Sequence, residues 1–212
     1  MSSGLIRALR KVPAFHVNAK KMWAGKPLKA GRFSLTVPDM HTARNIFLIG
    51  PRACGKTSVG RGLAERLGVP FVDTDHALVE AVGMDIAAYV DGHGWDAFRD
   101  AEAETLKREA APGGRVIGCG GGIVLREDNR AVLAGGITLY LKADVDELAR
   151  RLLRDPLEAQ RPSLTGKSVA DEVREVLAAR AHLYEGCADR VIEGPDLETA
   201  VDLAFRAVQT LS

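Results

Sequence analysis

The sequence contains no apolar run close to the roughly 18 residues that a membrane-spanning helix requires, so we expect no part of the chain to lie in a membrane. It also has few cysteines: Cys54, Cys119 and Cys187 are an odd number without C-x-x-C spacing. This pattern argues against a disulfide framework or a zinc site and is typical of a reducing compartment, so we expect a cytoplasmic protein. Internal repeats and low-complexity tracts are absent as well. We therefore expect one domain of about 170 residues and an additional segment.

The chain lacks a strong net charge, which is only +1, but the charge is unevenly distributed. Residues 1–39 contain eight of the 29 basic residues and one of the 28 acidic residues, so this segment carries +7 and the rest of the chain −6. We expect residues 1–40 to be a basic, poorly ordered N-terminal extension and residues 41–212 to be the folded domain. A targeting segment, an arm that contacts nucleic acid and an extended start before Met40 are the alternatives. Because the basic residues are scattered and aromatics are few, we expect no nucleic-acid partner.

Residues Gly50-Pro-Arg-Ala-Cys-Gly-Lys-Thr57 match the phosphate-binding loop pattern G-x-x-x-x-G-K-[ST] in full. A short apolar stretch, 45–49, precedes the match, and a stretch with helical spacing of apolar residues follows it. Such a strand–loop–helix unit directs backbone N–H groups at phosphate oxygens. The pattern predicts that the chain binds a nucleoside triphosphate, with Lys56 at the β- and γ-phosphates and the Thr57 hydroxyl on Mg²⁺. The residues expected to contact the nucleotide are Gly50, Ala53, Cys54, Gly55, Lys56, Thr57 and Ser58.

Short apolar stretches alternate with stretches of helical spacing along the rest of the domain. This alternation predicts an α/β fold with a parallel sheet, helices on both faces, and ligands at the carboxyl ends of the strands. Residues 155–170 are loop-like, and a loop of that length is more often functional than idle. We expect strands at 45–49, 70–75, 115–118, 137–141 and 190–192. We expect helices at 57–67, 75–82, 85–91, 95–110, 128–134, 146–154, 171–184 and 197–208.

Asp73 and Asp75 flank Thr74 at the carboxyl end of the second expected strand. Phosphoryl transfer requires an acid near Mg²⁺ and a group that orients or deprotonates the acceptor hydroxyl, and this pair can supply one acid for each task. The alternative is a helix N-cap followed by an acid that compensates the helix dipole. The two interpretations are compatible, because a capping carboxylate can still face a site.

Arg99 and Glu102 are three residues apart on one expected helix, so the carboxylate can hold the guanidinium in place. An arginine held in this way can bind a carboxylate through two hydrogen bonds, although a solvated surface ion pair would give the same pattern. Residues 120–122, Gly-Gly-Gly, follow the third expected strand. Glycines there allow backbone amides to approach a ligand closely, and a flexible turn is the alternative. Trp95, close to Arg99 in the sequence, is expected near the same site.

In order behind the phosphate-binding loop, the chain carries Asp73-x-Asp75, Phe98-Arg-x-x-Glu102, Gly120-Gly-Gly122 and Arg161-Pro-Ser-Leu. This ordered set closely resembles the shikimate kinases over about residues 44–210. The resemblance implies a P-loop NTPase fold of the nucleoside-monophosphate-kinase-like type, with a five-stranded parallel sheet, helices on both faces and a lid at about 155–170. It also implies ATP-dependent phosphorylation of the 3-hydroxyl of shikimate, a step towards aromatic amino acids, with Mg²⁺ as the metal.

The resemblance implies a role for each matching residue on the nucleotide side. Lys56 would bind the β- and γ-phosphates, while Thr57 and, through water, Asp73 would hold Mg²⁺. Arg161 would reach the transferring phosphates from the lid, and Arg154 would pack on adenine. An ordinary exposed helix arginine is the alternative for Arg154.

On the acceptor side, the resemblance implies that Asp75 binds shikimate hydroxyls and orients, or deprotonates, the 3-hydroxyl. Arg99, braced by Glu102, and Arg180 would bind the carboxylate, although Arg180 has the same alternative as Arg154. The backbone groups of the triple glycine, Gly120, Gly121 and Gly122, would close over the acceptor. Together the implied catalytic residues are Lys56, Asp75 and Arg161.

One position departs from the family pattern, because the loop usually has glycine where this chain has Ala53. Alanine readily adopts only negative φ, so we expect an ordinary backbone conformation at Ala53 and at most an altered nucleotide affinity.

Two alternatives to shikimate kinase activity stay open from the sequence. One is another small-metabolite kinase, such as a gluconate kinase, which the Arg99–Glu102 pair and the triple glycine disfavour. The other is a non-catalytic, ATP-responsive regulator that uses the basic arm, which intact Lys56 and Asp75 disfavour. The sequence leaves no exposed heptad or apolar stripe, so we expect a monomer that binds a small molecule.

Overall fold

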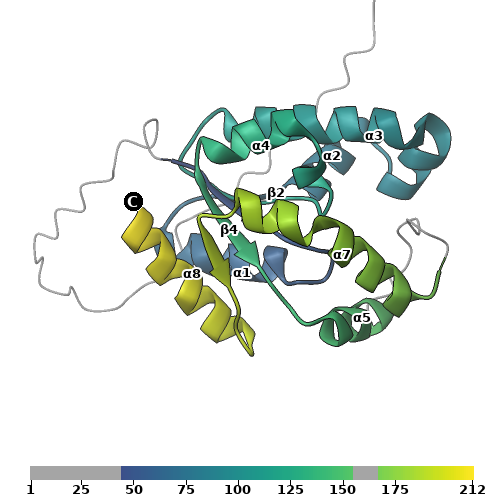
Figure 1. Cartoon of the computed structure of the whole chain (residues 1–212). Coiled ribbons are helices and arrows are strands. Elements are labelled where there is room, and N and C mark those ends of the chain that lie inside the picture. The colour runs from purple at the N-terminus through teal and green to yellow at the C-terminus, as the bar shows by residue number, and fades with distance from the viewer. Residues whose placement is uncertain (1–43, 155–166) are drawn as a thin grey trace, which may run out of the picture. The chain divides into compact units, whose positions relative to one another are not determined.

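The computed structural model describes residues 44–154 and 167–212, and in this part of the chain five short strands form one sheet (Figure 1). All neighbouring strands are parallel, in the order β2-β3-β1-β4-β5, so the predicted five-stranded parallel sheet is confirmed. The expectations for residues 1–40, for most of the lid and for Arg161 lie outside the described residues. The strands are β1 (Ile46–Ile49), β2 (Phe71–Asp73), β3 (Val116–Gly118), β4 (Ile137–Leu141) and β5 (Arg190–Ile192).

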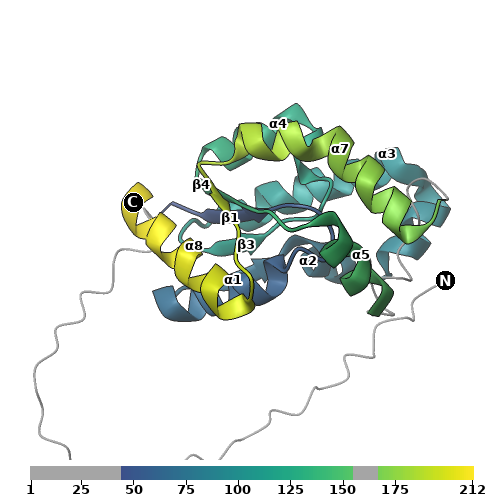
Figure 2. The same ribbon diagram turned by 60° about the horizontal axis from the view of Figure 1, so that its bottom comes forward.

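Helices cover both faces of the sheet, as Figures 1 and 2 show. The central strand β1 needs cover on both faces because alternate side chains point to opposite sides. Ile46 and Leu48 are buried in one apolar cluster, and Phe47 and Ile49 in the other. The helices that close the first cluster are α1 (Lys56–Leu67) and α8 (Leu197–Leu211). Those that close the second are α3 (Ile86–Ala110), α4 (Glu127–Ala134) and α7 (Val169–Cys187).

The segment predicted as two helices, 85–91 and 95–110, is one element, α3, with a kink at Gly94. Gly94 has a φ of +83°, a left-handed conformation that glycine adopts without strain, so the predicted break between the two helices exists as a kink. The prediction also lacks a short 3₁₀ turn, η1 (Ile123–Leu125), because three residues carry no periodic signal. Two further helices complete the described part, α2 (Thr74–Val82) and α5 (Val145–Arg154).

Because the strands are parallel, the segments that follow β1, β2 and β3 meet at one edge of the sheet. They are the loop that leads into α1, the start of α2, and the triple glycine. β3 and β4 flank β1 on opposite sides, so the loop after β1 lies at the position where open α/β sheets bind ligands. Among the helices of residues 44–154 and 167–212, none is long and apolar enough to cross a membrane.

Candidate active site

The phosphate-binding loop, residues 50–55, turns sharply between β1 and α1. Lys56 Nζ donates hydrogen bonds to the backbone oxygens of Gly50 (3.0 Å) and Pro51 (2.7 Å), so the ammonium group lies against the loop backbone. A Cβ on Gly50 would lie 2.6 Å from the backbone oxygen of Leu141, which explains glycine there. The N-cap of α1 is Gly55, which has no side chain to cap the first turn. The backbone N–H groups of that turn therefore favour an anionic ligand.

Ala53 adopts a φ of +61°, the one positive φ of a non-glycine residue in the described part of the chain. The expectation of an ordinary, negative φ is therefore wrong. Backbone N–H groups converge on an anion where successive residues alternate between right- and left-handed conformations. The path of the loop therefore decides the φ of Ala53, and the residue type does not. For alanine the left-handed region costs roughly 1–2 kcal/mol. The Ala53 oxygen accepts a hydrogen bond from Arg151 Nη1 at 3.2 Å.

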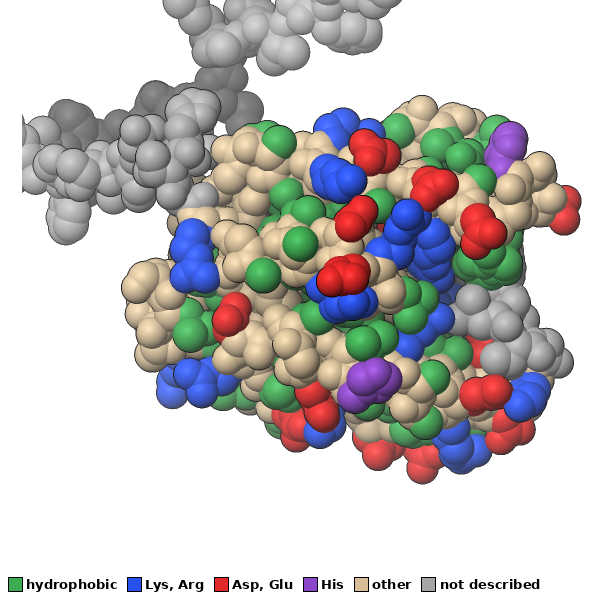
Figure 3. Space-filling view, turned by 45° about the horizontal axis from the view of Figure 1, so that its top comes forward, with side chains coloured by type: hydrophobic (Ala, Val, Ile, Leu, Met, Phe, Trp, Pro, Cys, Tyr) green, Lys and Arg blue, Asp and Glu red, His purple; other side chains and the backbone are tan. Residues whose placement is uncertain are grey.

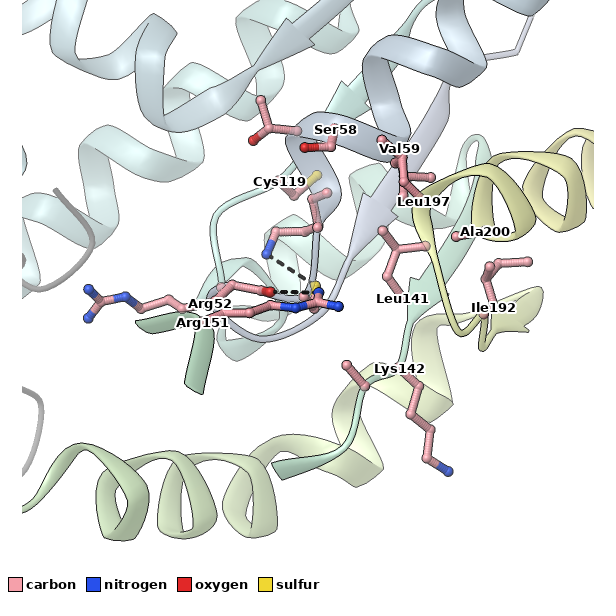
Figure 4. A pocket seen from close by; sticks show the side chains of 18 of the residues that line it. Arg52, Ser58, Val59, Cys119, Leu141, Lys142, Arg151, Ile192, Leu197 and Ala200 are labelled. Carbon is pink, nitrogen blue, oxygen red and sulfur yellow. Dashed lines mark hydrogen bonds between the residues drawn. The ribbon is translucent and has the colours of Figure 1, made fainter. Parts of the chain in front are cut away.

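A cavity of about 490 Å³ opens beside the loop (Figure 4), and we refer to it as the nucleotide cavity because most of the predicted nucleotide contacts line it. Its polar end is formed by residues 53–58 and by Asp73, so the predicted nucleotide contacts Ala53, Cys54, Gly55, Lys56, Thr57 and Ser58 all line it. Gly50, which was also predicted to contact the nucleotide, is not among the lining residues, and its backbone oxygen accepts a hydrogen bond from Lys56 Nζ. Arg154 is exposed and lines neither cavity of the described residues, and its contact with adenine stays a prediction.

The other end of this cavity consists of residues that sequence reasoning missed. They lie at the carboxyl ends of β4 and β5 and in the first turn of α8: Leu141, Lys142, Ile192, Leu197 and Ala200. The rule that ligands bind at the carboxyl ends of parallel strands was a signal that could have found them. Arg151 also lines the cavity, but it belongs to no motif, and its place depends on how α5 packs.

Thr57 and Asp73 lie together at the polar end of the cavity. Thr57 Oγ1 donates to Asp73 Oδ2 at 2.7 Å, while Asp73 Oδ1 accepts from the backbone N–H groups of Asp75 (3.0 Å) and His76 (3.4 Å). Asp73 is thus the N-cap of α2, and its other carboxylate oxygen accepts the bond from Thr57 at the end of the loop, so the N-cap interpretation is confirmed and the role near Mg²⁺ stays a prediction. Asp75 lies in the first turn of α2 and not on the strand. The hydroxyl and carboxylate are hard oxygen donors of the kind that Mg²⁺ prefers.

A second cavity, of about 90 Å³, brings together most of the residues predicted to bind the acceptor, and we refer to it as the acceptor cavity. Asp75, Arg99, Glu102, Gly121, Gly122 and Arg180 all line it, together with Trp95. Arg180 is half-buried here, so an ordinary exposed arginine does not describe it. Sequence reasoning missed Arg52, Phe98 and Tyr184 as lining residues. Figure 3 shows basic side chains gathered in a hollow on the side of the sheet that α3, α4 and α7 cover.

Arg99 and Glu102 form an ion pair in which the carboxylate is buried and the guanidinium half-buried, so it is not a solvated surface pair. Arg99 Nη1 donates to Glu102 Oε2 at 2.6 Å, and Glu102 is only 2% exposed. Burial raises the pKa of the Glu102 carboxyl, an effect that Arg99 partly opposes and that the nearby Asp75 reinforces. The pair holds the guanidinium in the cavity in a fixed orientation.

Space, and not flexibility, explains two of the three glycines, Gly120 and Gly122. A Cβ on Gly120 would lie 2.7 Å from Glu102 Oε1 and 2.8 Å from Asp75 Oδ1. A Cβ on Gly122 would overlap the guanidinium of Arg99. The backbone therefore packs directly against the charged groups of the acceptor cavity, which a plain turn would not do.

Gly121 is held by α7. Its backbone oxygen accepts hydrogen bonds from Tyr184 Oη (2.5 Å) and from Arg180 Nη1 (3.1 Å). Tyr184 is completely buried and stacks on Tyr140, with ring centroids 5.2 Å apart. Burial raises the pKa of Tyr184 to about 12, so the hydroxyl remains a donor at neutral pH.

Comparison with known proteins points to one family. The family model described as shikimate kinase matches residues 52–211. The chain is 51% identical over 150 residues to the shikimate kinase of Nitratidesulfovibrio vulgaris, covering 70% of this chain and 86% of that protein. It is also 51% identical over 149 residues to shikimate kinase 2 of Enterobacter sp., covering 70% of this chain and 85% of that protein.

Solved structures agree with these sequence matches. A shikimate kinase from Acinetobacter baumannii, in complex with shikimate, superposes with a TM-score of 0.73 at 34% identity, over 81% of this chain and 94% of that one. A shikimate kinase from Bacteroides thetaiotaomicron superposes with a TM-score of 0.70 at 30% identity, over 79% of this chain and 97% of that one.

Proposed function

This chain belongs to the shikimate kinase family, and from that premise we propose that it transfers the γ-phosphoryl group of ATP to the 3-hydroxyl of shikimate. The observation that carries the proposal is the position of Asp75, which lines both the nucleotide cavity and the acceptor cavity. The family match favours this activity over a gluconate kinase and over a non-catalytic regulator.

The nucleotide side stabilises charge on the transferring phosphoryl group. Lys56 turns from its bonds with Gly50 and Pro51 towards the β- and γ-phosphates, and the N–H groups at the start of α1 bind phosphate oxygens. Arg161 would add a second cation from the segment outside the described residues. Thr57 and Asp73 would hold Mg²⁺, which neutralises phosphate charge when bound.

The acceptor side orients the nucleophile. Arg99 and Arg180 bind the carboxylate of shikimate, because both guanidinium groups line the cavity and Arg99 is fixed by Glu102. Asp75 then accepts a hydrogen bond from the 3-hydroxyl and takes its proton. The hydroxyl oxygen forms a bond to the γ-phosphorus as the bond from that phosphorus to the β–γ bridging oxygen breaks, and ADP leaves. Two cations on one carboxylate also select against alcohols that lack this group. We propose that the enzyme works as a monomer in the cytoplasm.

The proposal is tested by coupling ADP release to NADH oxidation. MgATP is supplied with shikimate, gluconate, CMP or no acceptor, using the full chain. We expect turnover with shikimate alone. Turnover with gluconate, or equal turnover with and without acceptor, would contradict the proposed function.

A further inference from the structure

Arg151 connects α5 to the strained position of the phosphate-binding loop. Its Nη1 donates to the Ala53 oxygen at 3.2 Å, and its Nε donates to Glu147 Oε1 at 2.8 Å (Figure 4 shows the first bond). The helix that carries both side chains is anchored, because Leu148 and Leu152 are buried. The guanidinium is therefore held at one side by a carboxylate and at the other by the loop.

The direction of the Ala53 carbonyl depends on the left-handed conformation. If Ala53 relaxed to a negative φ, its carbonyl group would rotate and the hydrogen bond from Arg151 would be lost. The amides after Ala53 would rotate in the same movement, and these amides are the ones that face the phosphates. A glycine at this position would adopt the same conformation without a comparable cost.

We propose that Arg151, held by Glu147, is a positioning residue that keeps Ala53 in its left-handed conformation and so keeps the loop amides in the geometry that binds phosphate. The inference deepens the proposed function, because it assumes that this loop binds the nucleotide. The alternative is that Arg151 acts only by touching the nucleotide, since it also lines the cavity.

A double-mutant cycle separates these two roles. The dissociation constant of MgADP is measured by calorimetry for the full chain and for Arg151→Met, Ala53→Gly and the double variant. We expect Arg151→Met to weaken MgADP binding by about 3- to 10-fold in the natural chain, the size of one hydrogen bond. In the Ala53→Gly background the same change should weaken binding by less than about 2-fold, because glycine needs no support.

Two further variants complete the test. Arg150→Met removes a neighbouring arginine that pairs with the same Glu147 but is 60% exposed, and it should leave MgADP binding unchanged. Glu147→Gln should reproduce part of the Arg151→Met effect, and it replaces that variant if Arg151→Met does not fold.

Equal weakening in both backgrounds would overturn the proposal, as would the absence of any weakening in the natural chain. MgADP binding requires no acceptor. If Arg151→Met weakened MgADP binding only in the natural background, as expected, but the enzyme did not phosphorylate shikimate, the role of Arg151 would stand and only the proposed function would be contradicted.

Discussion

The phosphate-binding loop and the acceptor cavity are neighbours, but they are built in opposite ways. The loop uses the backbone of one continuous segment, residues 50–57, and its charged side chain Lys56 rests on that same backbone. The acceptor cavity uses side chains from α2, α3 and α7 and the triple glycine, which lie far apart in the sequence. Backbone recognition tolerates replacement of side chains, whereas recognition by assembled side chains does not.

The difference extends to where each region stores unfavourable energy. In the loop it is conformational, because Ala53 occupies the left-handed region. In the acceptor cavity it is electrostatic, because burial raises the pKa of Glu102 while Asp75 lies nearby. Functional sites commonly hold such strain, and the surrounding structure must offset it. Changes in the acceptor cavity should therefore have specific effects on shikimate and small effects on ATP.

The largest effect is expected at Asp75, where the two regions meet. Asp75→Asn keeps the shape of the side chain but removes the proton acceptor, so kcat should fall by about 10²- to 10⁴-fold. Asp100→Asn, an exposed acid on α3, is the matched control and should retain full activity. Steady-state kinetics on both variants test this, and a kcat close to that of the natural chain would show that Asp75 does not act on the acceptor.

Arg99→Ala should give the next largest effect. Loss of a charged hydrogen-bonding partner should raise KM for shikimate by about 10- to 100-fold while KM for ATP stays unchanged. Arg108→Ala on the same helix, whose guanidinium pairs with Glu109 and is half exposed, serves as the control. Equal increases in the KM values for shikimate and for ATP would contradict the assignment of Arg99 to the acceptor.

A smaller effect is expected for Tyr184→Phe, which removes one of the two hydrogen bonds to Gly121. The triple glycine should then be held less firmly, so KM for shikimate should rise by about 2- to 10-fold with KM for ATP unchanged. Tyr140→Phe removes the hydroxyl of the other ring in the stack and leaves both bonds to Gly121 in place. If the two variants behave alike, the hydrogen bond to Gly121 has no special role.

The smallest effect concerns stability and pH. Because the folded-state pKa of Glu102 is raised, the folded chain retains this proton where the unfolded chain has lost it. The raised pKa therefore adds to the free energy of unfolding. This contribution is complete below the ordinary pKa of 4.5 and is lost as pH rises through the folded-state pKa. Glu102→Gln cannot titrate, so the stability of the natural chain relative to this variant should decrease as pH rises above 4.5. Urea unfolding of both chains at a series of pH values measures the difference in their free energies of unfolding. If the natural chain keeps a constant advantage over the variant, or gains one as pH rises, the raised pKa is contradicted.

Much of the fold and part of the site could be predicted from the sequence. The strand–loop–helix around Lys56 is a local unit, and the alternation of strands and helices predicts the parallel sheet. The spacing of Arg99 and Glu102 predicts their contact, because residues three apart on a helix are neighbours. Burial is what distinguishes this pair from a surface ion pair, and no local pattern reports burial.

What the sequence by itself determined is therefore local: the phosphate-binding loop, the order of the elements, and the identity of most charged residues in the site. The tertiary structure alone decided the left-handed conformation of Ala53, the contact of Arg151 with it, and the bonds from Tyr184 and Arg180 to Gly121. The physical reason is the range of the interactions. Backbone hydrogen bonding and side-chain spacing within a helix or strand act over a few residues. The bonds from Arg151, Arg180 and Tyr184 join residues that are 59 to 98 positions apart, so they form only when the helices pack on the sheet.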